Sequence, residues 1–339
     1  MIFGKEIMSL AINTTTPEGL VLAADSRQSY RNRKGQTRIG SDSASKIFEL
    51  SRSIGLAITG PAFLEEEGIP KNISKFVEDF KKQYKVEGKN VETVAHSLHK
   101  FFDEKYNYKK ALGELPEKIK RELEQKGLKI LDFRQENGRV IFKFKDKEGK
   151  IGEGVGGVDQ LVFIVAGYNS NGSHQVFMIH VPGQIEEKRS SEIRGKEYGA
   201  SWAGQIDVIA RVVLGRDPRL SNLHFVQQAV KNFGEETVRR ELGGLEYAIS
   251  WGTMNLQDSI DFSVLMIQTT SAIQRFSDGI SMDPGDITGV GGPVDVAVIT
   301  PNKGFVWVTK KTLNVGEAAI DLDKFPDLIR EKTSNKKSS

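Results

Sequence analysis

Hydroxyl and charged side chains recur among the apolar runs near the start of the chain. Ser9 and the run Thr14–Thr16 supply hydroxyls, while Asp25 and Lys46 supply a carboxylate and an ammonium. A hydroxyl is a poor nucleophile unless a base takes its proton, and a free α-amine on the same residue can serve because its pKa is about 8. An unpaired Asp or Lys is costly in a strand-rich interior, so Asp25 and Lys46 are expected to form a pair. That pair serves either the hydroxyl chemistry or the structure alone.

The apolar runs around these residues predict strands that bring them together. The runs are broken at residues 16–19, Thr-Pro-Glu-Gly, which indicates two strands joined by a tight turn. Two further strands are expected to begin at Lys46 and Ile54. We expect a small chemical site where these strands converge.

Hydrophobic spacing predicts the elements of the rest of the chain. Helices are expected over segments 73–80, 94–102, 116–125, 202–213 and 256–275, the last with Ile260, Val264, Ile267 and Ile273 on one face. Strands are expected over segments 128–133, 139–145, 161–166, 175–180, 294–300 and 305–308. Each sheet must bury its apolar face, so this order predicts two sheets packed together and covered by helices.

Composition excludes several classes of function. The chain has no cysteine, which removes disulfides, thiolate nucleophiles and thiolate metal sites. A net charge of +3 with 27% charged residues gives no general case for binding nucleic acid or a membrane surface. No apolar stretch is long enough to span a bilayer, and the first residues lack the pattern of a secretory signal. The sequence therefore predicts a cytoplasmic protein of enzyme size.

Two other motifs are better explained without a ligand. The glycine-rich run Gly152–Gly157 precedes a strand rather than a helix, and no Gly-Lys-Ser/Thr follows it. His96 and His99 lie on an expected helix with no third ligand nearby. We therefore expect neither an organic cofactor nor a metal.

Three blocks of sequence resemble proteasome β-type subunits and their bacterial relatives, the N-terminal nucleophile (Ntn) hydrolases. Residues 19–27 read Gly-Leu-Val-Leu-Ala-Ala-Asp-Ser-Arg, residues 46–48 read Lys-Ile-Phe, and residues 54–60 end in Ile-Thr-Gly. The resemblance implies a four-layer α-β-β-α sandwich of two antiparallel sheets. It also implies cleavage of peptide or amide bonds, self-association into a ring or cage, and an ATP-dependent unfoldase as a partner.

The resemblance assigns the nucleophile to Ser9. A gap-free alignment on residues 19–25 places Ser9 where the family has its N-terminal nucleophile. Thr14 is less suitable, because starting there leaves almost no first strand before the turn. The alternative is that Ser9 is an ordinary strand residue behind an uncleaved N-terminus.

The resemblance also implies roles for three further residues. Lys46 would be the ammonium that tunes the hydroxyl and the α-amine, and Asp25 would orient and balance that Lys. Gly60 would present its N–H to the developing oxyanion, since a glycine permits close approach. A strand-ending turn before Pro61 is the structural alternative for Gly60.

The chain departs from the family pattern at three places. The family's assisting serine aligns with Arg194, and its Asp-x-x-Ser motif maps ambiguously onto residues 286–289, beginning at Asp286. Met8 stands before Ser9, where the family commonly has glycine. These departures put self-processing in question.

The expected organisation is one domain with additions. Residues 1–8 would be a propeptide, 9–330 one proteasome-like domain, and 331–339 a flexible tail, with insertions near 109–157 and 217–251. Two rival functions use the same fold. One is a non-catalytic ring or scaffold subunit, and the other is a small-molecule amidase that forms no ring.

Overall fold

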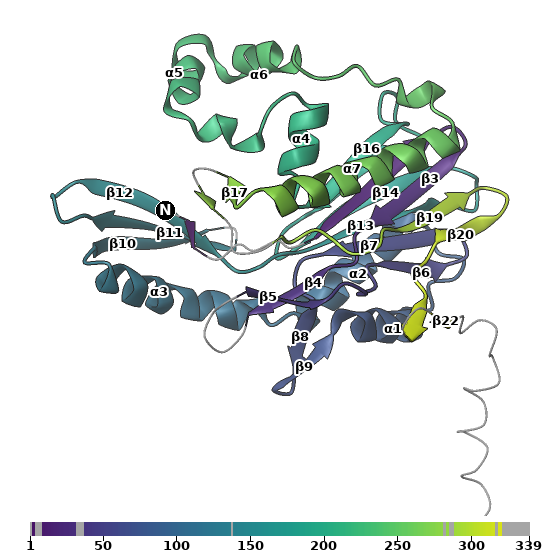
Figure 1. The fold of residues 1–339 in the computed structure, drawn as a ribbon, viewed down its shortest axis with the longest axis horizontal. Helices are drawn as coiled ribbons and strands as arrows, with labels where there is room; N and C mark the ends of the chain where they lie inside the picture. The colour runs from purple at the N-terminus through teal and green to yellow at the C-terminus, as the bar shows by residue number, and fades with distance from the viewer. Residues whose placement is uncertain are drawn as a thin grey trace, which may run out of the picture.

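The computed structural model describes residues 2–3, 9–31, 37–136, 138–280, 283–284, 288–315 and 318–320. These residues form seven α-helices and several antiparallel sheets (Figure 1). The mixed α/β class with antiparallel sheets is therefore confirmed. Within the described part of the chain, no helix is long and apolar enough to cross a membrane.

One five-stranded antiparallel sheet carries the N-terminal segment. Its strands, in spatial order, are β16 (Gly199–Gly204), β2 (Leu10–Thr16), β3 (Gly19–Ala24), β19 (Asp295–Thr300) and β20 (Gly304–Thr309). The expected hairpins β2–β3 and β19–β20 are both present. Every residue of β2 and β3 is buried, so both faces of this sheet are covered.

The second five-stranded sheet is also antiparallel. It runs β15 (Ile185–Ser190), β14 (His174–Val181), β13 (Leu161–Tyr168), β7 (Ile54–Thr59) and β6 (Ile47–Ser51). The strands expected at Lys46, Ile54, Leu161 and Gln175 are all found in it. Its centre is β13, a run of eight buried residues.

The two sheets pack face to face, and helices cover their outer faces. Side chains such as Leu22, Ala57 and Ile164 form the shared core between the sheets. Helices α1 (Ile73–Tyr84) and α2 (Val91–Lys105) pack on the second sheet, where they bury Phe80, Phe102 and their neighbours. Helices α4 (Asp207–Val213) and α7 (Leu256–Phe276) pack on the first sheet. This layering encloses three successive apolar cores.

Helix α7 spans the expected residues, and most of its expected apolar face packs on the sheet. Ile267 is buried and Ile260 and Val264 pack beside it, whereas Ile273 is 49% exposed. The face against the sheet also includes Ser259 and Ser263, whose small side chains allow a close approach. The Thr14 hydroxyl lies 3.3 Å from the Ser263 hydroxyl at this contact.

Two other helix predictions are wrong in part. Segment 199–204 is strand β16, and helix α4 begins only at Asp207 rather than at Trp202. Small residues alternate between buried and partly exposed along β16, as the two-residue period of a strand requires. Helix α3 spans Tyr108–Gln125, so Pro116 lies inside it rather than at its start.

Segments 109–157 and 217–251 contain additional elements (Figure 1). In the first, α3 packs on β10 (Lys129–Glu136), β11 (Arg139–Lys145) and β12 (Ile151–Gly157) around a separate apolar cluster. Strand β1 (Ile2–Phe3) pairs in parallel with β12. The second contains η1 (Pro218–Asn222), α5 (His224–Phe233), α6 (Glu235–Gly243) and η2 (Trp251–Thr253).

Four small hairpins complete the structure. They pair β4 (Gln28–Arg31) with β5 (Thr37–Ser41), β8 (Phe63–Glu66) with β9 (Ile69–Asn72), β17 (Gly279–Ile280) with β18 (Asp283–Pro284), and β21 (Leu313–Val315) with β22 (Ala318–Ile320). Residues 4–8, most of the expected propeptide, and the expected tail 331–339 lie outside the described residues.

Candidate active site

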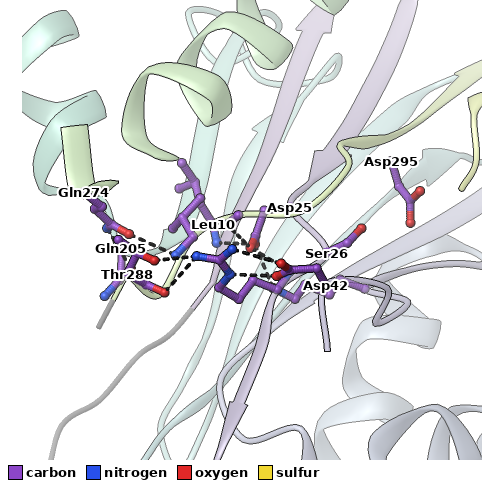
Figure 2. A network of polar contacts seen from close by, with 12 residues as sticks. Leu10, Asp25, Ser26, Asp42, Gln205, Gln274, Thr288 and Asp295 are labelled. Atoms are coloured by element: carbon purple, nitrogen blue, oxygen red, sulfur yellow. Dashed lines mark hydrogen bonds and ion pairs between the residues drawn. The ribbon is translucent and has the colours of Figure 1, made fainter. Parts of the chain in front are cut away.

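The Asp25 carboxylate is the centre of a buried polar network at the end of β3. Its Oδ1 accepts hydrogen bonds from Lys46 Nζ at 2.7 Å and from the Leu10 backbone N–H at 2.9 Å. Its Oδ2 accepts from the backbone N–H groups of Gly291 at 3.0 Å and Arg27 at 3.1 Å. Figure 2 shows Asp25 beside Leu10 within this network. The carboxylate is thus held by donors from four segments of the chain.

Lys46 stands immediately before β6 and is buried with Asp25. Burial lowers the pKa of Lys46 from its ordinary value of 10.5, and the negative charge of Asp25 partly opposes that effect. The positive charge of Lys311 also lowers the pKa of Lys46. The pairing of Asp25 with Lys46 that the sequence predicts is therefore present.

Ser9, Lys46 and Gly60 line one pocket of about 300 Å³. Ser9 precedes β2 and is 3% exposed, and Gly60 directly follows β7. The pocket therefore brings together residues from both sheets. Asp25 does not line the pocket itself, but it pairs with Lys46, which does.

Gly60 occupies a position that requires glycine. Its φ is +109°, and a Cβ there would overlap the backbone carbonyl oxygen of Gln160. The close approach of the Gln160 carbonyl therefore explains the glycine here. Gly60 also lines the pocket, so its backbone lies at the pocket wall.

Gln205 and Gln274 are the main residues that the sequence analysis missed. The Gln205 N–H donates to the Ser9 carbonyl oxygen at 2.8 Å, and Gln274 Nε2 donates to Gln205 Oε1 at 2.8 Å. The Val290 N–H then donates to Gln274 Oε1 at 2.9 Å. Figure 2 shows Gln205 and Gln274 together beside Thr288. These amides fix the backbone on one side of Ser9.

The register of β16 explains why Gln205, rather than Arg194, lies beside Ser9. Gly204 pairs with Leu10 and Gly199 pairs with Thr15, so residue 205 is adjacent to Ser9. Arg194 lies before the far end of the strand and is exposed, so it does not stand beside Ser9. Because small residues stand on both faces of β16, no apolar alternation in the sequence could have revealed this.

Arg27 holds the segments that carry Asp42 and Thr288 next to the site. Its guanidinium forms a bidentate ion pair with Asp42, at 2.7 and 3.0 Å, and donates to the Thr288 hydroxyl. The hydrogen bond from Arg27 lowers the pKa of Asp42. Asp286 itself lies outside the described residues, so its expected role is not addressed by these contacts.

The ion pair between Lys311 and Asp295 lies near the ion pair between Asp25 and Lys46. Lys311 Nζ contacts the Asp295 carboxylate and donates to Ser26 Oγ at 3.1 Å. Asp295 is 3% exposed and also accepts the Lys311 N–H at 2.9 Å. This pair fixes the chain that follows β20 against the end of β3.

No protein-family model and no curated protein matches the chain. The sequence pattern and the geometry of this site are therefore the observations that bear on function.

The network predicts that substitutions of Asp25 and Lys46 lower the free energy of unfolding by different amounts. Asp25→Ala should lower the free energy of unfolding by about 3–5 kcal/mol, because it leaves a buried ammonium and three backbone N–H groups without their acceptor. Lys46→Met should cost less, since the carboxylate keeps its backbone donors. Urea unfolding followed by circular dichroism measures both changes.

The control for this experiment is Glu66→Ala, which removes a partly exposed carboxylate that pairs with Lys71 and Lys105 at the surface. Solvent screens these pairs, so we expect a smaller change in the unfolding midpoint than for Asp25→Ala. Equal midpoints for the Asp25 and Glu66 variants would show that the Asp25 network does not stabilise the fold.

Proposed function

We propose that this chain is a proteasome-like Ntn hydrolase that cleaves peptide or amide bonds, with Ser9 as the nucleophile. The observation that carries the proposal is the pocket shared by Ser9, Lys46 and Gly60, with Asp25 paired to Lys46 behind it. Two packed antiparallel sheets with helices on both outer faces fit the α-β-β-α sandwich of that family.

The proposed reaction begins once the bond between Met8 and Ser9 has been cleaved. Ser9 Oγ attacks the substrate carbonyl, and the freed α-amine of Ser9 accepts the hydroxyl proton. The Gly60 N–H stabilises the oxyanion. The amine then protonates the leaving nitrogen, the C–N bond breaks, and an ester to Ser9 remains. Water attacks that ester, releases the acid and restores the hydroxyl.

Lys46 and Asp25 support this reaction through charge. The Lys46 ammonium lies at the same pocket as Ser9 and lowers the proton affinity of a nearby amine. Asp25 keeps the ammonium in place with a 2.7 Å hydrogen bond. The Gln205 N–H donates to the Ser9 carbonyl oxygen, so the backbone on the C-terminal side of Ser9 is held in place.

Assembly into a ring or cage is part of the proposal. Large apolar side chains are exposed on α5 and α7, among them Phe225, Phe233, Leu265 and Phe276. Both helices lie on the same side of the molecule (Figure 1). Exposed large apolar side chains on these helices make them candidates for an interaction surface. In the cytoplasm, such an assembly would receive peptides from an ATP-dependent unfoldase.

The rival scaffold and small-amidase functions are separated from this proposal by two properties. A scaffold subunit would assemble without releasing the residues before Ser9. A small-molecule amidase would act as a monomer.

The first prediction concerns the bond before Ser9. In the folded precursor the Ser9 hydroxyl attacks the Met8 carbonyl, the Met8–Ser9 C–N bond breaks as its nitrogen takes up the proton, and water hydrolyses the resulting ester to release residues 1–8. Protein purified from its native cells should therefore lack residues 1–8, and Ser9→Ala should retain them. Intact-mass analysis measures this, with Thr14→Ala as the control that still processes. Assembled wild-type protein with Met8 still attached would favour the scaffold function.

The second prediction concerns alkaline pH. The rate constant kcat/KM should fall when Lys46 loses its proton, and the fall should occur below pH 10.5 because burial lowers the pKa of Lys46. Asp25→Asn removes the charge that stabilises the ammonium, so the pKa of Lys46 falls further and the alkaline limb moves to lower pH. Rate profiles of folded Asp25→Asn and Glu66→Gln test this. An alkaline limb at the same pH in both variants would contradict the role of Lys46.

The third prediction concerns assembly. Multi-angle light scattering should give a mass several times 37.7 kDa. Leu265→Asp with Phe276→Asp should reduce that mass, because burying these carboxylates in an interface is unfavourable. The surface variant Lys75→Asp serves as the control. A monomer mass for wild type over a broad concentration range would favour the small amidase.

A further inference from the structure

The first residues of the chain pair with the edge of the sheet in segment 109–157. In that sheet the strand order is β1-β12-β11-β10, so β12 lies between β11 and the two residues of β1. Ile2 pairs with Val155 and Phe3 with Gly156, and the two strands run parallel. Figure 1 shows the N-terminus beside these strands. The edge of β12 therefore already holds an extended peptide segment, which is the first part of the expected propeptide.

Most of this edge is not used by β1. Strand β12 has seven residues and pairs with β11 along its whole length, whereas β1 covers only two of them. Among the strands that the structure describes, no other one pairs with this edge. The edge of a strand presents a row of backbone N–H and C=O groups with which an extended peptide can pair. Residues 151–154 therefore leave room for a longer segment than β1.

Packing explains the glycine-rich sequence of β12. A Cβ on Gly152 would lie 2.5 Å from the ring of Phe144, and a Cβ on Gly156 would lie 2.6 Å from the side chain of Ile119. These glycines let strand β11 and helix α3 lie close to β12, so no phosphate ligand is needed to explain them. Because β12 is held by this packing, its edge is formed before a peptide binds.

The chain leads directly from β12 to the candidate pocket. Strand β12 ends at Gly157, and Asp159 lines the pocket together with Ser9. The Tyr106 hydroxyl donates to the Asp159 carbonyl oxygen at 2.6 Å, which holds this connection in place. A peptide that runs parallel to β12 therefore has its C-terminal end directed toward the pocket.

The direction of this pairing matches the chemistry proposed for Ser9. Self-processing joins residues 1–8 to Ser9 Oγ as an ester, and cleavage of a substrate joins the substrate's acyl side to the same oxygen. Both acyl segments extend from that oxygen toward their own N-terminus. Phe3 and Ile2 are the sixth and seventh residues before the bond between Met8 and Ser9. The corresponding residues of a substrate can therefore reach the same edge.

We propose that the edge of β12 is a binding site for the acyl-side segment of an extended peptide substrate. Residues 2–3 occupy the edge before cleavage. After their release, the substrate residues at the sixth and seventh positions before the attacked bond take their place through main-chain hydrogen bonds. The inference rests on the proposed function, because Ser9 must release residues 1–8 to vacate the edge.

A second copy of the chain fits this edge less well than a peptide does. A two-fold symmetric contact between two copies pairs a strand with itself in the antiparallel direction. The segment that occupies β12 is parallel instead. The direction of β1 therefore favours a peptide that leads into the pocket.

The first test varies the length of the acyl side. Peptides with five, seven or eleven residues before the cleaved bond share one sequence up to the fifth residue. With protein that begins at Ser9, kcat/KM should rise about 10-fold from five to seven residues, because two residues gain main-chain hydrogen bonds. It should rise again up to eleven residues, where the register of β1 reaches Ile151, and then level off. Equal kcat/KM for all three lengths would overturn the inference.

The second test methylates one backbone nitrogen of the longest peptide at a time. The N–H groups of successive strand residues point to opposite edges, so only alternate ones face β12. Methylation at the sixth to ninth positions should therefore lower kcat/KM by about 5-fold at every second position and leave it unchanged at the others. The unaffected positions are the matched controls. A uniform effect along the peptide would contradict pairing with a strand.

A cross-link tests the register without requiring cleavage. The chain has no cysteine, so Val155→Cys introduces a single thiol on β12. The probe is a peptide of the sequence 1–8 with Ile2→Cys, activated as a mixed disulfide with thionitrobenzoate. In protein that begins at residue 9 and carries Ser9→Ala, the Val155→Cys thiolate should displace thionitrobenzoate and form a disulfide with the peptide. Mass spectrometry measures this adduct.

Three controls define the specificity of the cross-link. A peptide with Lys5→Cys instead of Ile2→Cys is out of register and should react at least about 10-fold more slowly, as should Val306→Cys on β20 of the other sheet. The full-length form of the Val155→Cys and Ser9→Ala protein keeps residues 2–3 on the edge. It should therefore also react at least about 10-fold more slowly.

The outcomes separate this inference from the proposed function. If protein that begins at Ser9 cleaves peptides but its Val155→Cys thiol reacts no faster than the Val306→Cys control, the β12 site is overturned and the hydrolase stands. If the cross-link is selective but no peptide is cleaved, the hydrolase is overturned and β12 remains a peptide-binding edge. A disulfide-linked dimer through Val155→Cys that excludes the peptide would identify a second copy as the occupant and overturn the inference.

Discussion

The ion pair between Asp25 and Lys46 joins the two sheets at the end where Ser9 lies. Asp25 follows β3 of the first sheet, and Lys46 precedes β6 of the second. A buried carboxylate is tolerated only when its lone pairs are satisfied, and here four donors satisfy them. One of those donors is the Leu10 N–H, next to Ser9. The requirement to neutralise Asp25 therefore fixes the position of the candidate nucleophile.

The three apolar cores make this arrangement possible. Because β2 and β3 are covered on both faces, their ends are the places where side chains can reach solvent. Ser9, Asp25 and Gly60 all lie at such ends, as does Lys46. A pocket there can be lined by residues of both sheets, as the pocket beside Ser9 is. Because the faces of both sheets are covered, the candidate site lies at the strand ends.

Much of this site was predictable, because its residues lie in short blocks close together in the sequence. The strands around Asp25, Lys46 and Gly60 follow from their apolar runs, and their order predicts convergence. Gln205 and Gln274 were not predictable, since they are 69 residues apart and meet only in the fold. Strand β16 was missed because small residues, rather than large apolar ones, form its buried side.

The same packing distinguishes the two candidate hydroxyls at the start of the chain. The Thr14 hydroxyl donates to the Ser259 carbonyl oxygen and contacts Ser263 beneath α7, so it is engaged in holding the helix. It lies within β2, whose backbone is bonded on both sides. Ser9 precedes that strand, at the pocket, and only a residue in this position can present a free amine and a hydroxyl to the same ligand. The proposed chemistry therefore requires cleavage before Ser9, because Thr14 is held within the sheet.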